Sequence, residues 1–303
     1  MDKRLEVPDR KIDVILDTDA YNEVDDQFAI AYLLRCGEKL NVLGFTAAPY
    51  FNSRSESPED GMEKSYAEIR HILTLAGRTD LLDEVYKGSR AYLPDEKTPL
   101  DSPAARQIVA WAKAHTPEEP LYVVAIGAIT NVASAFLIDP SVVNNTVVVW
   151  LGGHGYDYEE GADTKEFNMR QDVAAARVVM GSAAPFVQLP CNGVVSEFRV
   201  TEAELRIWLV GKGDLCDYLA RHALDVEEKV KPGQPWSRVI WDVTAVAWLM
   251  NDGGRFMKSR LAPLRLPGYD GKYGSPTGKL FRYVFKIDRD ALMCDLFRRL
   301  LGD

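Results

Sequence analysis

Cysteine and histidine are scarce in this chain of 303 residues, and those present are widely spaced. The four cysteines include no Cys-x-x-Cys pair, and no two of the four histidines stand at the short spacing of a zinc site. A zinc knuckle and a disulfide framework are therefore not indicated. Scattered thiols are typical of a reducing compartment, so we expect a cytoplasmic protein. Any bound metal is expected to be held by oxygen atoms.

Positive charge is also scarce. Thirty-six Lys and Arg residues stand against 45 Asp and Glu residues, which gives a formal net charge of −9, and no basic cluster stands out. Proteins bind nucleic acid largely by neutralising phosphates with basic side chains, so we expect no nucleic acid partner. We expect instead a substrate that is neutral or is bound with the help of a metal.

Long apolar segments are few. The first eleven residues, MDKRLEVPDRK, lack the apolar core of a signal peptide. The longest uncharged run, residues 120–138, is long enough to span a membrane. Gly127, Thr130 and Asn131 divide that run into a β-branched half and an alanine-rich half, a pattern that favours a buried strand turning into a helix. We therefore predict a soluble protein with no membrane partner.

Apolar runs alternate with segments of helical periodicity over the first two thirds of the chain. This alternation predicts an α/β fold with a mostly parallel open sheet flanked by helices. Strands are expected at residues 11–16, 40–47, 122–127, 146–151 and 186–189. Helices are expected at residues 25–35, 62–76, 102–114, 131–137 and 171–179.

The pattern changes after Thr201. Helical segments near 201–209, 213–226 and 237–250 predict a mainly helical C-terminal third, in which Phe281 to Ile287 is expected to be an edge strand before a last helix. No internal repeat or linker is visible, so we expect residues 1–303 to form a single domain.

The stretch DTDAYNEVDD, residues 17–26, directly follows the apolar run that ends the first expected strand. Its aspartates, Asp17, Asp19, Asp25 and Asp26, would repel one another and raise one another's pKa unless a cation neutralised them. Helix-dipole and turn-capping preferences account comfortably for two of them but not for four. A hard divalent cation is therefore expected, and Ca²⁺ tolerates such irregular carboxylate geometry better than Mg²⁺ does.

Four segments, in the right order, resemble the nucleoside hydrolase family of the inosine-uridine preferring type. DTDAYNEVDD is similar to the family's Asp-x-Asp-Pro-Gly-x-Asp-Asp turn, although it is two residues longer and lacks the Pro-Gly pair. VAIGAITNVASA (124–135) resembles the family's strand and Leu-Thr-Asn helix, and EFNMRQDVAAA (166–176) its Glu-Phe-Asn segment. IWDVTAVA (240–247) resembles its late helix that bears an aspartate. The resemblance covers nearly the whole chain.

The resemblance implies a Ca²⁺ cofactor and assigns roles to particular residues. The ligands would be Asp19, Asp26, Asp242 and the backbone carbonyl of Ile126, and Asp19 would also be the base for the attacking water. Asp25 would bind the 2′-hydroxyl of a ribose, while Asp17 fits a role in orienting the ligand loop.

Other residues would bind the substrate. Glu166 and Asn168 would contact the rest of the sugar, Asn22 resembles a sugar-contacting Asn, and Asn52 matches an Asn or Asp near the reaction centre. Taken singly, Glu166 and Asn168 could equally be capping residues, and Asp242 could cap the helix that follows it. Thr130 and Asn131 are interpreted as a helix start and are left out of the site.

Two positions depart from the family pattern. Many members have His immediately before the late aspartate, where this chain has Trp241, as in the purine-preferring branch; Trp241 would stack on the base or, alternatively, belong to the core. Where the family has an Asn for the 5′-hydroxyl, this chain has Glu160. His154 and Asp163 are rival candidates for that contact.

The leading hypothesis is Ca²⁺-dependent hydrolysis of the N-glycosidic bond of ribonucleosides, with purines or modified purines favoured. An alternative is a catalytically silent nucleoside-binding or ribose-binding protein that keeps the metal site. A third hypothesis, a phosphohydrolase with Asp17 as nucleophile, is opposed by the lack of a phosphate-binding loop. The resemblance also implies a homodimer or homotetramer.

Overall fold

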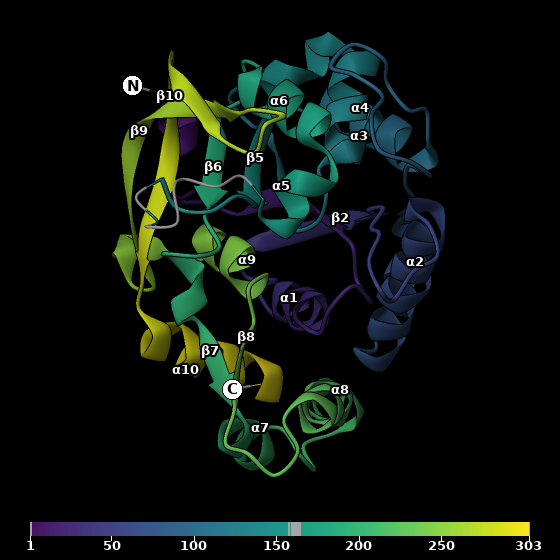
Figure 1. Cartoon of the computed structure of the whole chain (residues 1–303), viewed down its shortest axis with the longest axis vertical. Helices are drawn as coiled ribbons and strands as arrows, with labels where there is room; N and C mark the ends of the chain where they lie inside the picture. The colour runs from purple at the N-terminus through teal and green to yellow at the C-terminus, as the bar shows by residue number, and fades with distance from the viewer. Residues whose placement is uncertain (1, 157, 159–164, 303) are drawn as a thin grey trace.

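The structure is a computed structural model that describes residues 2–156, 158 and 165–302. Within these residues an eight-stranded sheet has the strand order β3-β2-β1-β4-β5-β6-β10-β9 (Figure 1). Every neighbouring pair is parallel except β10 and β9, which confirms the expected mostly parallel open sheet. The strands of this sheet are β1 (Ile12–Thr18), β2 (Leu40–Ala47), β3 (Val85–Lys87), β4 (Leu121–Ala125), β5 (Thr146–Leu151), β6 (Phe186–Leu189), β9 (Met257–Pro267) and β10 (Tyr273–Ile287). A separate antiparallel pair is formed by β7 (Arg199–Thr201) and β8 (Ser237–Val239).

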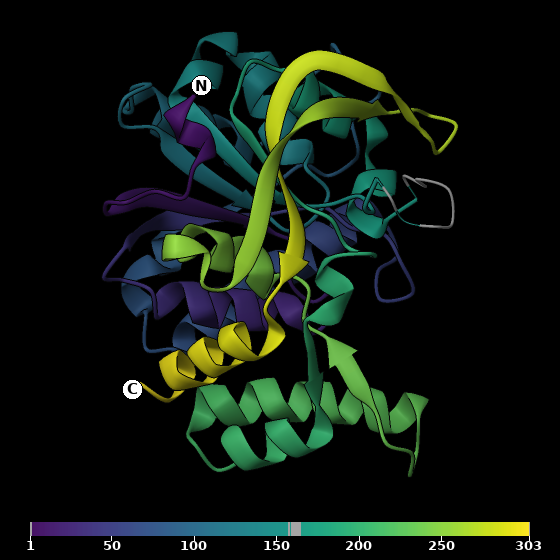
Figure 2. The ribbon, with the colours of Figure 1, turned by 90° about the vertical axis from the view of Figure 1, so that its left-hand side faces the viewer.

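Helices cover both faces of the sheet. Figure 1 shows α3, α4 and α6 on one side and α1, α9 and α10 on the other, and each side has its own cluster of buried apolar residues. Figure 2 shows α7 and α8 as a further layer beyond α10. The helices are α1 (Asp25–Leu34), α2 (Pro58–Leu75), α3 (Pro103–Lys113), α4 (Thr130–Ile138), α5 (Phe167–Gln171), α6 (Val173–Gly181), α7 (Glu202–Trp208), α8 (Asp214–Val230), α9 (Val243–Leu249) and α10 (Arg289–Leu301).

Local sequence explains where several elements begin. The central strands β1, β4 and β5 are apolar runs that are buried almost throughout, as expected for parallel strands covered on both faces. The helices α2 and α3 each start at a Ser-Pro pair, in which the serine side chain accepts a backbone N–H and the proline occupies the first turn. For this reason α2 begins at Pro58, four residues before the start predicted from apolar periodicity.

The C-terminal third is less helical than expected. The strands β9 and β10 form a long antiparallel hairpin there, of which the sequence analysis found only Phe281–Ile287. That segment is not an edge strand, because it lies between β6 and β9, and the edge is β9 itself. The expected helix at 237–250 is likewise divided into β8 and the shorter α9. Apolar residues alternate with charged residues or prolines along β9, which is typical of a half-buried strand, but prolines inside a run argue against a strand and obscure this pattern in the sequence.

The uncharged run of residues 120–138 becomes β4, a short turn and α4, as predicted. Both elements lie in the buried core. Across the described part of the chain, none of the helices combines the length and apolar character needed to cross a bilayer.

Candidate active site

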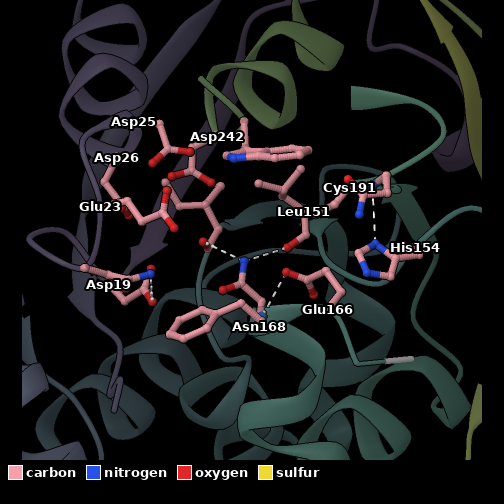
Figure 3. A pocket seen from close by; sticks show the side chains of 15 residues that line it. Asp19, Glu23, Asp25, Asp26, Leu151, His154, Glu166, Asn168, Cys191 and Asp242 are labelled. Atoms are coloured by element: carbon pink, nitrogen blue, oxygen red, sulfur yellow. Dashed lines mark hydrogen bonds between the residues drawn. The ribbon is translucent and has the colours of Figure 1, made fainter. Parts of the chain in front are cut away.

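A cavity opens beyond the carboxyl ends of β1, β4, β5 and β6 (Figure 3). Asp19 follows β1, Ile126 follows β4, Leu151 ends β5 and Cys191 follows β6, and all four line it. Parallel strands bring their carboxyl ends to one edge of a sheet, so residues far apart in sequence meet there. The acidic turn of residues 17–26 contributes directly to the lining, and so do Glu166 and Asn168.

Three buried carboxylates meet in this cavity. Asp25 and Asp26 begin α1, Asp242 directly precedes α9, and α1 packs against α9. Each offers an oxygen atom, and these oxygens all lie within 4.8 Å of one another. The predicted convergence of Asp242 with the acidic turn, across more than 200 residues of sequence, is therefore present. Asp19, which is 1% exposed, lines the same cavity.

Burial and mutual repulsion make these carboxyl groups hard to ionise. Burial, with the nearby charge of Glu23, raises the pKa of Asp25 to about 7. The pKa values of Asp19, Asp26 and Asp242 are raised well above the ordinary value, first by burial and then by the negative charges of neighbouring aspartates. No lysine or arginine is among the described residues that line the cavity. Four carboxylates without a basic partner in the lining fit a divalent cation with oxygen ligands.

A chain of hydrogen bonds fixes Asp19. The side-chain amide of Asn22 donates to Asp19 Oδ2 over 3.1 Å, and the amide of Asn52 donates to Asn22 Oδ1 over 2.5 Å. The backbone N–H of Arg54 in turn donates to Asn52 Oδ1. Asn22 lines the cavity, whereas Asn52 lies one hydrogen bond further out. Gly127 passes so close that a Cβ there would lie 2.9 Å from Asp19 Cγ, so this position requires glycine.

Glu166 and Asn168 line the cavity but also serve the local backbone. The Glu166 carboxylate caps α5 by accepting the N–H groups of Asn168 and Met169, and it also accepts the N–H of Gly153. Asn168 Nδ2 donates to the carbonyl oxygens of Ile126 and Leu151, each over 3.0 Å. The capping role considered for Glu166 is therefore real. Asn168 contacts the same Ile126 carbonyl that the resemblance assigns to the metal.

Asp17 lies behind the cavity rather than in its lining. Its Oδ1 accepts hydrogen bonds from Thr46 Oγ1 and from Asn131 Nδ2, over 2.6 and 2.8 Å, while its Oδ2 is buried without a hydrogen-bond partner. Burial raises its pKa to about 6. Asp17 is the residue of β1 whose carbonyl oxygen accepts the N–H of Ile126, so it joins the two strands that end at the site.

Thr130 and Asn131 are more than a helix start. Neither caps α4, whose first turn has no side-chain cap. Thr130 donates to Asp172, and Asn131 links Asp17 to the carbonyl of Ala47 and the N–H of Ser89. Sequence reasoning left Asn131 out because an Asn at a helix start is usually a cap, and only the resemblance to a Leu-Thr-Asn motif could have drawn attention to it.

Trp241 and His154 also line the cavity. Trp241 is partly buried and directly precedes Asp242, so its position allows the stacking role as well as core packing. His154 Nδ1 accepts the backbone N–H of Asn192 over 3.3 Å. The rival candidates Glu160 and Asp163 lie outside the described residues. Sequence reasoning did not single out five other lining residues, which are Glu23, Leu151, Phe167, Cys191 and Asn192.

Comparison with known proteins gives a consistent result. The family model of the inosine-uridine preferring nucleoside hydrolase matches residues 14–266. An inosine-uridine preferring nucleoside hydrolase of Leishmania major is 33% identical over 116 residues, which are 38% of this chain and 35% of that protein. The match thus spans about a third of the length of this relative.

Solved structures share the fold over almost the whole chain. A plant nucleoside hydrolase is similar with a TM-score of 0.75 and 19% identity, covering 96% of this chain and 99% of that one. A purine-preferring ribonucleoside hydrolase from Gardnerella vaginalis is similar with a TM-score of 0.70 and 21% identity, covering 96% and 98%. The family match extends from β1 to β9 and so includes every strand end that lines the cavity. The chain belongs to the inosine-uridine preferring nucleoside hydrolase family.

Proposed function

We propose that this protein hydrolyses the N-glycosidic bond of ribonucleosides with the help of Ca²⁺. The observation that carries the proposal is the group formed by Asp25, Asp26 and Asp242, whose oxygens lie within 4.8 Å of one another in a cavity at the carboxyl ends of the parallel strands. Membership of the family supports it, as do the raised pKa values, since buried carboxyl groups of this kind need a cation to ionise together.

We assign the cation to Asp19, Asp26, Asp242 and the carbonyl oxygen of Ile126, with Asp25 as acceptor for the 2′-hydroxyl. Asp25 lies in the same group of oxygens as Asp26 and Asp242, so a hydroxyl that it accepts would lie beside the ion. The hydrogen bond from Asn168 to the Ile126 carbonyl supports this oxygen as a ligand, because it fixes where the carbonyl points.

When bound, the cation would lower the pKa of a water and hold the sugar diol. Asp19 would take the proton of the attacking water, and its Oδ2 is fixed for this by Asn22. As the water oxygen bonds to the anomeric carbon, the bond to the base nitrogen breaks and the base leaves with the electron pair, to be protonated afterwards. Carboxylates around the cavity would stabilise the oxocarbenium character of the sugar in the transition state.

Preference for a purine or a modified purine is the finer part of the proposal. Trp241 lies in the cavity lining beside Asp242, where an indole ring could stack on a flat base. A larger base offers more stacking area. His154, which lines the same cavity, is our candidate for contact with the 5′-hydroxyl.

The test is a panel of ribonucleosides incubated with calcium-loaded protein, with free base measured by chromatography and ribose as reducing sugar. We expect turnover of at least one purine ribonucleoside, and Asp19→Asn should lower it far more than Asp17→Asn. Bound calcium without turnover of any ribonucleoside would instead indicate the silent binding protein. A greater loss in Asp17→Asn would contradict the role given to Asp19.

A cytoplasmic location, a single domain over residues 1–303 and a homodimeric or homotetrameric assembly remain parts of the proposal. Light scattering coupled to gel filtration measures the assembly directly. A monomer at micromolar concentration would contradict it.

A further inference from the structure

Glu23 brings a further acidic side chain to the cavity from the segment between Asp19 and Asp25. This segment is two residues longer than the family's turn, and Glu23 lines the cavity on the side that also holds Asp19 and Asp26 (Figure 3). After burial, its negative charge is the next cause that raises the pKa of Asp25. Glu23 therefore shares one cavity with the carboxylates of the proposed metal site.

The Glu23 carboxylate, like that of Asp19, lies outside the group of carboxylate oxygens that are within 4.8 Å of one another. Within the described chain that group consists of Asp25, Asp26 and Asp242. Glu23 Oε2 instead forms an ion pair with Arg238 of β8 over 2.7 Å. The other end of the Arg238 guanidinium pairs with Glu227 of α8 over 2.6 Å, and both of these side chains are largely buried.

Different arginines bind the backbone and the side chain of this segment. Arg54 donates to the carbonyl oxygens of Tyr21 and Glu23, over 3.4 Å each, whereas Arg238 binds only the carboxylate of Glu23 in this segment. Loss of the Arg238 guanidinium would therefore free the carboxylate and leave those backbone contacts in place. A free carboxylate beside a hard divalent cation is a ligand for it.

We propose that Arg238 is a positioning residue that keeps Glu23 off the bound cation. This inference rests on the proposed function. A fourth carboxylate on the ion would tighten metal binding, but it would occupy a coordination position that a sugar hydroxyl or the attacking water needs. The guanidinium, anchored by Glu227 on the long helix α8, offers Glu23 a charged hydrogen-bonding partner other than the ion.

The test measures calcium affinity by titration calorimetry in the wild-type chain, Arg238→Gln and the double variant Arg238→Gln/Glu23→Gln. We expect Arg238→Gln to bind calcium about tenfold more tightly and to show a higher KM for a ribonucleoside, and the double variant to return toward wild type in both. Damage to the fold would weaken calcium binding. The direction of the change in calcium affinity therefore separates the proposed role of Arg238 from damage to the fold. Lys231→Gln is the matched control, because within the described part of the chain Lys231 forms its ion pair with Glu227 and not with Glu23.

Equal or weaker calcium binding in Arg238→Gln, or tighter binding that persists in the double variant, would overturn the inference and leave the proposed function standing. Absence of calcium binding in the wild-type chain would overturn both. Crystals of the calcium-loaded wild-type protein give a second measurement that needs no variant. They should show the Glu23 carboxylate on Arg238, and a Glu23 oxygen coordinated to calcium would refute the inference.

Discussion

Removing calcium should make the stability of this protein fall as the pH rises. The pKa of Asp25 is raised to about 7 by burial and neighbouring charge, against an ordinary value of 3.8. Between pH 3.8 and about pH 7, Asp25 of the metal-free folded chain therefore keeps a proton that the unfolded chain has lost. The stabilisation is fully present below pH 3.8 and is lost as the pH rises through 7.

The size of this effect follows from the pKa difference. The full difference for Asp25 corresponds to about 4 kcal/mol, and the part lost between pH 5 and pH 8 is about 2–3 kcal/mol. At roughly 2–4 °C per kcal/mol, the melting temperature should fall by roughly 5–10 °C over that range from Asp25 alone. Asp19, Asp26 and Asp242, whose pKa values are also raised by burial, act in the same direction.

The assay is thermal unfolding at pH 5 to 8, once in metal-depleted buffer and once with excess calcium. Calcium favours the ionised carboxylates, so its stabilising effect should grow with pH. Burial also lowers the pKa of His222, and this shift makes stability rise with pH. The variant Asp25→Asn is therefore needed to isolate the contribution of Asp25 to the melting temperature. It should flatten the metal-free profile, whereas Asp80→Asn on the surface should not. A metal-free melting temperature that rises from pH 5 to 8 in the wild-type chain, and no more steeply in Asp25→Asn, would refute the reasoning.

Three further predictions concern the substrate. Trp241→Ala should raise KM for purine ribonucleosides about 10–100-fold and for pyrimidine ribonucleosides less, because base stacking contributes about 1–3 kcal/mol; equal effects on both would contradict stacking. Asn52→Ala should lower kcat about tenfold, since it removes the donor that fixes Asn22, whereas Asn41→Ala in a surface contact should leave kcat unchanged. A 2′-deoxyribonucleoside should have a kcat/KM about 10⁴-fold lower than its ribonucleoside, because Asp25 would lose its hydroxyl partner; comparable rates would remove that role from Asp25.

The sheet could be predicted because its central strands are unbroken apolar runs. Segments such as β5, TVVVWL, are buried on both faces, and their short length and β-branched residues favour a strand over a helix. The hairpin of β9 and β10 was missed for the opposite reason. Its outer part carries prolines, glycines and charges, and it is held as a strand by pairing with a partner rather than by its own pattern.

The site residues likewise include some that the sequence could predict and others that it could not. Asp25, Asp26 and Asp242 could be assigned because the acidic turn is unusual in itself and the late aspartate stands in a segment that resembles the family. Asn131 and Glu23 could not, because their roles depend on contacts with residues far away in the chain. Asn131 bonds to Asp17 across 114 residues and Glu23 pairs with Arg238 across 215, and neither distance leaves a local signal in the sequence.

The position of Asp242 links metal binding to packing between α1 and α9. Asp25 and Asp26 start one helix and Asp242 precedes the other, and these helices pack together through apolar side chains such as Phe28 and Trp248. Packing thus brings together carboxylates that repel one another, and the burial of apolar surface offsets that repulsion in the metal-free chain. A cation bound between the helix ends would attract all of these carboxylates and so outweigh their mutual repulsion. The same contacts that assemble the site would then also be those that calcium stabilises most.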